Sequence, residues 1–267
     1  MDMMLVLGIL ASIFFISLTL ICLYHDSINT KIFNAVFVAL DVIFYFVWNL
    51  GMYERGWLND GFETFGNISP FIFTVIPLTY LMHPKVKEYA FSAIALLWLG
   101  MFVALFISPE YAYIYDYHRQ ASVLYTGEAL CHMLASLFGI YLIITKQVKL
   151  NLQTWIRAIV FMYSGIFFGV FLNYFFHKAH FGMNPYGNFS IYFLDIFGTF
   201  EATFIAYLFG VLTVLTVGMQ LAMLFKYLIE PKKVKTQHLH TLAEEGELEI
   251  IEADVVREET PTETTGE

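Results

Sequence analysis

Three side chains that could do chemistry lie near the middle of one long apolar run, residues 122–145: Glu128, Cys131 and His132. Positions three and four apart share one face of a helix, so Glu128 faces the same side as the other two. An imidazole can act as a general base, a thiol as a nucleophile and a carboxylate as the group that orients the base. A simpler interpretation is that these groups only hydrogen-bond to neighbouring helices and hold them together.

The depth of these residues favours a function. The run is long enough to cross a bilayer as one helix, because about 20 apolar residues suffice. An ionisable side chain at that depth costs roughly 2.5–3.5 kcal/mol on insertion scales, a cost that falls when the group finds a partner. Such residues mark functional sites by default. We therefore expect Glu128 and His132, one helical turn apart, to form a coupled pair.

The composition is that of a membrane protein with several spans. Of the 267 residues, 58% are hydrophobic and only 14% are charged, which excludes an ordinary soluble domain. The net charge of −9 comes from the C-terminal end, because ten of the 23 acidic residues follow His240 with one base, Arg257. The rest of the chain is neutral, so we predict no nucleic-acid partner. Cys22 and Cys131 both lie in apolar runs and indicate no disulfide framework.

Seven apolar runs predict an all-α membrane protein, a bundle of seven transmembrane helices. The first run has no basic segment before it and no cleavage site after it, which predicts an uncleaved span. The third is short and contains Pro70 and Pro77, which are tolerated where neighbouring helices satisfy the backbone. The expected spans are about 3–24, 32–52, 67–82, 89–108, 122–145, 155–176 and 199–228.

The basic residues predict the orientation of the bundle. Three of them, Arg55, Arg119 and Lys178, lie at one set of helix ends and ten lie at the other. By the positive-inside rule the N-terminus is outside and the C-terminus cytoplasmic, as in a multi-pass protein of the cell membrane. The ten are Lys31, Lys85, Lys87, Lys146, Lys149, Arg157, Lys226, Lys232, Lys233 and Lys235.

The transmembrane domain is expected to cover residues 1–235. Residues 236–267 form an acidic tail with few aromatic residues. Such a segment cannot bury a core, so we expect it to be disordered and cytoplasmic, where it could bind a partner.

With this orientation, polar residues from several spans converge on the outer half of the bundle. Asp41, Tyr45 and Asn49 recur at four-residue steps of the second span and form a polar stripe. We predict a polar pocket there, and neither a metal nor a cofactor, since His177 and His180 have no third ligand nearby. The expected ligand-binding residues are Asp41, Asn49, Asn67, Asn173, Asn184 and Asp195.

A family resemblance adds to this interpretation. The segments Leu172-Asn173-Tyr174, Asn184 and Leu194-Asp195-x-x-Gly198, together with His132 at the end of Glu-Ala-Leu-Cys-His, resemble the YwaF family of bacterial integral membrane proteins. That family is similar to the transmembrane protein 164 acyltransferases, which implies acyl transfer through a cysteine thioester. The family tends to carry His and Cys at the start of its third helix. Registered on Pro77, those positions are Asn67 and Ser69 here, so the family's route lacks its cysteine.

Two classes of function are open. The first is a lipid-directed acyl transferase or hydrolase, with His132 as general base, Glu128 orienting it and Ser69 or Cys131 as nucleophile. In that class Asn67, Asn173 and Asn184 are candidates to stabilise an oxyanion. The second is a receptor, transport or accessory protein that binds a lipid headgroup or a small polar ligand without a covalent intermediate. A hydroxyl or thiol within hydrogen-bonding reach of His132 would favour chemistry. Membrane lipids are the expected partners in both.

Overall fold

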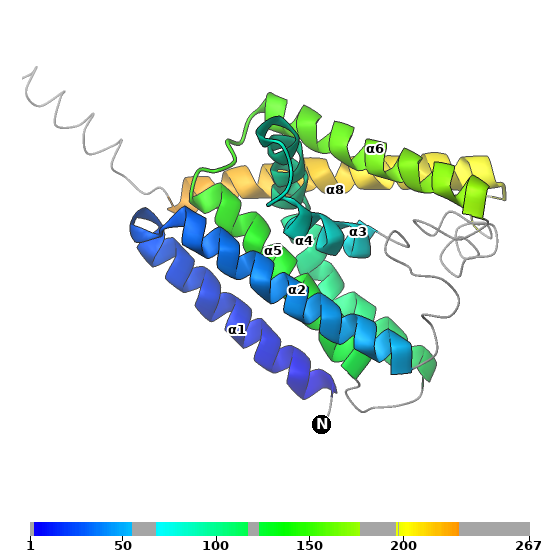
Figure 1. Ribbon diagram of the computed structural model, residues 1–267, viewed down its shortest axis with the longest axis horizontal. Coiled ribbons are helices and arrows are strands. Elements are labelled where there is room, and N and C mark those ends of the chain that lie inside the picture. The colour runs from blue at the N-terminus through cyan, green and yellow to red at the C-terminus, as the bar shows by residue number, and fades with distance from the viewer. Residues whose placement is uncertain (1–2, 55–67, 117–122, 177–195, 197, 230–267) are drawn as a thin grey trace, which may run out of the picture. The chain divides into compact units, whose positions relative to one another are not determined.

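The computed structural model describes residues 3–54, 68–116, 123–176, 196 and 198–229, and within these ranges all regular secondary structure is helical (Figure 1). The chain divides into two compact units, residues 1–223 and 224–267, and the account below concerns the first. Its elements are α1 (Met3–Tyr24), the short 3-10 turn η1 (His25–Ser27), α2 (Thr30–Glu54), α3 (Ile68–Leu78), α4 (Pro84–Asp116), α5 (Val123–Ile144), α6 (Leu152–Phe176) and α8 (Phe200–Ile229).

Six of these helices are long and apolar enough to cross a membrane: α1, α2, α4, α5, α6 and α8. The all-α prediction is confirmed for the described residues, and the six helices support a multi-pass membrane protein. Helix α3 is apolar but has only 11 residues. At 1.5 Å per residue it is about 16 Å long, roughly half of a hydrocarbon core.

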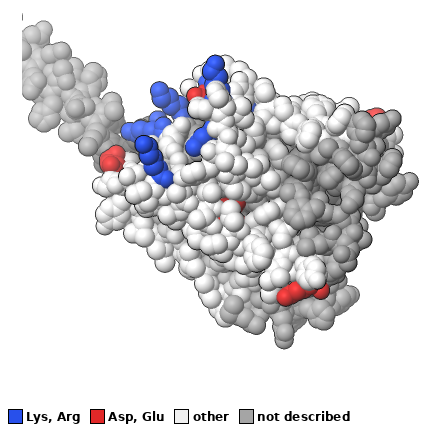
Figure 2. Space-filling view, viewed as in Figure 1, with Lys and Arg blue, Asp and Glu red and all other residues white. Residues whose placement is uncertain are grey.

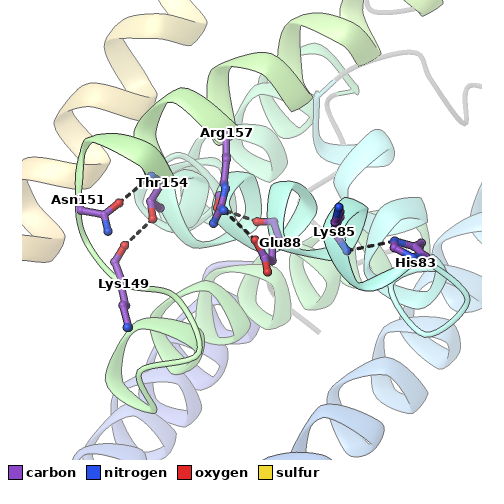
Figure 3. Close-up of polar contacts among 8 residues, drawn as sticks. His83, Lys85, Glu88, Lys149, Asn151, Thr154 and Arg157 are labelled. Atoms are coloured by element: carbon purple, nitrogen blue, oxygen red, sulfur yellow. Dashed lines mark hydrogen bonds and ion pairs between the residues drawn. The ribbon is translucent and has the colours of Figure 1, made fainter.

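Side-chain caps explain where several helices start. The Asn29 side-chain oxygen accepts a hydrogen bond from the main-chain N–H of Lys31 at 3.1 Å, just before α2. The Asn151 oxygen accepts one from the N–H of Thr154 at 2.9 Å at the start of α6 (Figure 3). Such caps satisfy main-chain donors that have no partner within the helix.

The third apolar run ends its helix four residues before the end of the expected span 67–82, and a short turn leads from it to the next helix. Helix α3 ends at Leu78. His83 then caps α4, its Nδ1 accepting a hydrogen bond from the main-chain N–H of Lys85 at 3.4 Å (Figure 3). Pro84 occupies the first position of α4, where its missing N–H costs nothing.

Helix α5 is the centre of the first unit. Buried residues make up 89% of its apolar stretch, against 22–28% for α1, α2, α6 and α8. It contacts α1, α2, α3 and α4. Glycines allow this close packing: a Cβ added at Gly127 would lie 2.6 Å from the Trp48 Cα, and one at Gly139 would lie 2.7 Å from the Ile94 carbonyl oxygen. The run that carries the candidate chemistry is therefore the most enclosed helix.

Helix α8 packs on α4 and α6 through its residues up to 223. The Trp98 indole N–H donates to the Gly218 carbonyl at 3.3 Å, across the α4–α8 contact. The Tyr163 hydroxyl of α6 donates to the Leu208 carbonyl at 2.9 Å. These bonds join the C-terminal helices to α4, one of the helices that surround α5.

The described lysines and arginines of the first unit gather at one end of the helices, which we call the basic end (Figure 2). Contacts between elements bring these residues together: Arg157 forms an ion pair with Glu88 at 2.8 Å (Figure 3), and the Lys87 ammonium lies 5.6 Å from the centre of the Tyr80 ring. The six are Lys31, Lys85, Lys87, Lys146, Lys149 and Arg157.

Candidate functional site

The imidazole of His132 in α5 joins two polar groups. Its Nδ1 lies 2.9 Å from the main-chain carbonyl oxygen of Glu128, and its Nε2 lies 2.9 Å from Oγ of Ser69 in α3. A carbonyl only accepts, so we assign the ring proton to Nδ1. The neutral ring then accepts at Nε2, and the Ser69 hydroxyl donates to it. His132 is 1% exposed, so this pair lies in the interior of the bundle.

The first turn of α3 places Ser69. It is the second residue of the helix, and Phe73 follows four positions later on the same face. The Phe73 ring meets the imidazole edge-on, with centroids 5.1 Å apart and planes at 87°. Phe73 is fully buried. The aromatic ring and the two hydrogen bonds together fix the plane of the imidazole.

Glu128 positions His132, but through its main chain. The expectation was a carboxylate paired with the imidazole, whereas the hydrogen bonds described for the two ring nitrogens go to the Glu128 carbonyl and to Ser69. The Glu128 side chain is half-buried. Any residue at position 128 supplies such a carbonyl, so the residue type was not the signal for this contact.

Cys131 faces a different neighbour. It is fully buried and close enough to Asp41 and Tyr45 of α2 for electrostatic interaction. Adjacent residues on a helix point about 100° apart, and here His132 faces α3. Of the two nucleophiles considered from the sequence, Ser69 is therefore the one in hydrogen-bonding contact with the imidazole.

The polar residues of the α2 stripe contact one another and α3. The Tyr45 hydroxyl accepts a hydrogen bond from Thr74 of α3 at 3.4 Å. The Asn49 amide donates to the Tyr45 main-chain carbonyl at 2.7 Å, so this donor is used within its own helix. Asp41 is fully buried, and neither carboxyl oxygen has a hydrogen-bond partner among the described residues. Tyr45 is close enough to interact electrostatically with Asp41, so it links Asp41 to the rest of the stripe.

Two residues near the site were missed from the sequence. Phe73 packs on the imidazole and Thr74 bonds to Tyr45. The available signal was spacing, because both follow Ser69 by about one helical turn. An aromatic residue in an apolar run is ordinary, so residue type alone did not single out Phe73.

Several predicted residues lie outside the described part of the chain. Asn67, Asn184 and Asp195, together with His177 and His180, fall in undescribed segments. Asn173 belongs to α6, but its side chain is not described. Within the described ranges, no group of three or more His, Cys, Asp or Glu side chains is arranged to hold a metal ion.

Comparisons of the chain with family models, with curated proteins and with solved structures give no match. The resemblance to the YwaF family therefore rests on the sequence motifs, and the chemistry is argued from the geometry of the site.

Proposed function

We propose that the protein is a multi-pass membrane enzyme that transfers or hydrolyses the acyl group of a lipid ester, with Ser69 as nucleophile and His132 as general base. The observation that carries this proposal is the 2.9 Å contact between Ser69 Oγ and His132 Nε2, with Nδ1 held by the Glu128 carbonyl. A serine hydroxyl becomes nucleophilic when a correctly oriented base accepts its proton. This arrangement supplies both the base and the group that orients it.

The proposed reaction has two steps. As Ser69 Oγ attacks the ester carbonyl, its proton moves to His132 Nε2 and the Glu128 carbonyl stabilises the imidazolium at Nδ1. The tetrahedral intermediate then expels the lipid alcohol, which takes that proton and leaves an acyl ester on Ser69. In the second step, water or the hydroxyl of an acceptor lipid attacks the acyl carbonyl and gives its proton to His132. The second tetrahedral intermediate then expels Ser69 Oγ, which takes that proton back, and the fatty acid or new ester leaves.

The N-terminal end of α3 supports the charge that this reaction develops. Ser69 lies in its first turn, where the helix dipole is positive and favours an oxyanion. Pro70 brings no N–H of its own, so other main-chain amides must serve. Asn67, Asn173 and Asn184 remain the proposed side-chain contributors.

The surroundings of the pair favour a lipid substrate. His132 lies nine residues along α5 from Val123, which is about 14 Å into the helix. At that depth the medium around the bundle is hydrocarbon. Phe73 and Trp48, whose ring centroids are 6.2 Å apart, are among the apolar side chains near the pair. An ester attached to an acyl chain can reach such a site, whereas a fully hydrated substrate cannot without a large desolvation cost.

We also propose seven spans, with the N-terminus outside and the C-terminus cytoplasmic in the cell membrane. The basic end supports this orientation, because cytoplasmic ends carry the excess of lysine and arginine. With this orientation the pair belongs to the outer half, because His132 is nearer Val123 than the Ile144 end of α5. A reporter fused after Glu267 is expected to be cytoplasmic. An external reporter signal would contradict both the orientation and the leaflet assigned to the site.

A serine-reactive fluorophosphonate tests the nucleophile. Purified full-length protein in lipid nanodiscs should be labelled at Ser69, as located by mass spectrometry of its peptides. Ser69→Ala and His132→Gln should each lower labelling and ester turnover by at least about 100-fold, the range for a nucleophile or base. Ser69→Cys should still be acylated, since a thiol beside the same base is nucleophilic.

Ser136→Ala is the matched control. Its hydroxyl is also buried in α5 but donates to the Trp98 carbonyl at 2.8 Å and has no imidazole partner. Labelling and turnover should survive this change. Retained lipid without labelling at Ser69 and without ester turnover would contradict the enzyme and favour the binding protein for a lipid headgroup or polar ligand.

A further inference from the structure

Asp41 is an acid in the interior with no partner for its polar atoms. It is 0% exposed, and neither Oδ1 nor Oδ2 has a hydrogen bond within the described part of the protein. One turn before it, Phe37 packs on Phe138 of α5 with ring centroids 5.0 Å apart. One turn after it, Tyr45 lies against Trp48 at 5.5 Å. The carboxyl group is thus enclosed between aromatic side chains at the contact of α2 with α5.

The charges around Asp41 do not stabilise an anion. Among the described side chains, Tyr45 of α2 and Cys131 of α5 interact with it electrostatically, and Cys131 interacts in turn with Glu128. Tyr45 and Cys131 are ordinarily neutral near pH 7, and neither is a cation. The described lysines and arginines of this unit are at the basic end. An isolated carboxylate in such a place is far less stable than the neutral acid. The packed state therefore holds Asp41 with a proton.

Helices α2 and α5 pack tightly against each other on the Trp48 side of Asp41. A Cβ at Gly127 would lie 2.6 Å from the Trp48 Cα, and one at Gly51 would overlap the Leu124 main chain. Interiors packed this closely do not admit water without a movement of the helices. Since Asp41 is 0% exposed in this packing, we expect exchange of its proton with water to need a separation of α2 from α5.

We propose that Asp41 is a proton-binding site, which holds its proton while α2 is packed on α5 and releases it when the two helices separate. The ligand is the proton itself. The site is separate from the proposed pair, because Asp41 interacts with Cys131 of α5 whereas Ser69 and His132 meet where α3 contacts α5. Separation of α2 from α5 is then linked to release of the Asp41 proton, so a rise in pH favours it.

Dicyclohexylcarbodiimide, which reacts with protonated carboxyl groups in apolar surroundings, tests the site in full-length protein in nanodiscs. Asp41 should be labelled at acidic pH, with labelling falling about tenfold per pH unit once most of the acid is ionised. Asp41→Asn should abolish it. Glu88→Gln is the control, since Glu88 is exposed and paired with Arg157, and it should leave the labelling unchanged.

Infrared spectroscopy gives a measurement that does not depend on entry of a reagent. Wild type should show the carbonyl band of a protonated acid, absent from Asp41→Asn, and this band should disappear on raising the pH. Gly127→Ala should speed its deuterium exchange several-fold, because the added methyl group pushes Trp48 away. Gly210→Ala should not, because nothing lies within 4 Å of its Cβ. A band that persists at all pH values, or that is absent at all of them, would overturn the proposal.

Discussion

Buried polar groups on two sides of α5 differ in their hydrogen bonding. Towards α3, the His132 imidazole has both nitrogens in hydrogen bonds, to Ser69 and to the Glu128 carbonyl. Towards α2, Asp41 is equally enclosed but has no hydrogen bond among the described residues. A buried pair with all its hydrogen bonds made is held in one geometry, whereas a buried group without a hydrogen bond lowers the stability of the packed state. The first face is suited to oriented chemistry and the second to a change of state.

The largest expected loss of stability comes from a substitution where α3 packs on α5. Phe73→Ala should lower the free energy of unfolding by about 3–5 kcal/mol, the cost of emptying a packed aromatic site. Phe73 is fully buried and its ring contacts His132, Tyr45 and Trp48. Chemical unfolding in detergent micelles measures the change. Phe209→Ala, at a residue 64% exposed on α8, is the control and should lie near zero. Equal losses at the two sites would contradict the packing of α3 on α5.

A smaller loss of stability is expected from a substitution where α2 packs on α5. Gly51→Ala should destabilise the protein by about 1–3 kcal/mol, because the new methyl group overlaps the Leu124 main chain, which cannot rotate away. Gly8→Ala on α1 is the matched control, since nothing lies within 4 Å of its Cβ. It should be neutral or slightly stabilising, as alanine is the better helix former. A neutral result at Gly51 would mean that α2 lies farther from α5.

The helices were predictable from the sequence, and the reason is physical. Apolar runs of membrane length form helices because the backbone has no other partner there. The six long helices follow the expected runs closely, although α4 continues to Asp116 and α3 stops at Leu78. The seven-span count stays a prediction, since α3 alone is too short to cross. The orientation also stays a prediction, because it follows from the basic residues alone.

The candidate site was less predictable. Ser69 and His132 were both named from the sequence, but their contact depends on which face of α5 meets α3. In a membrane protein both lipid and protein faces are apolar, so hydrophobic periodicity does not identify that face. The hydrogen bond described between Glu128 and the imidazole comes from the Glu128 main chain. Residue types indicate side-chain chemistry and carry no signal for a carbonyl that every helix offers.

Double-mutant cycles measure which groups on the α3 side of α5 interact directly with His132. Ser69→Ala and His132→Gln should be non-additive by about 1 kcal/mol, because they share one buried hydrogen bond. Glu128→Gln and His132→Gln should be additive within about 0.5 kcal/mol, since the bond uses the unchanged main chain. The measurement is the free energy of unfolding of each single and double variant. Strong coupling between positions 128 and 132 would restore the carboxylate–imidazole pair expected from the sequence.

The smallest effect has the opposite sign and belongs to the α2 face. Asp41→Val should leave the protein as stable as wild type or more stable by about 1 kcal/mol at neutral pH, since it removes an unsatisfied buried group. The packed state holds a proton that unfolded Asp41 releases, so raising the pH destabilises wild type relative to Asp41→Val. The advantage of Asp41→Val should therefore grow with pH.

Asp26→Val, at an acid whose side chain is 88% exposed, should change stability by less than about 0.5 kcal/mol at any pH. A marked loss of stability in Asp41→Val would show that the carboxyl group has a stabilising partner, and the contrast between the two faces of α5 would fail.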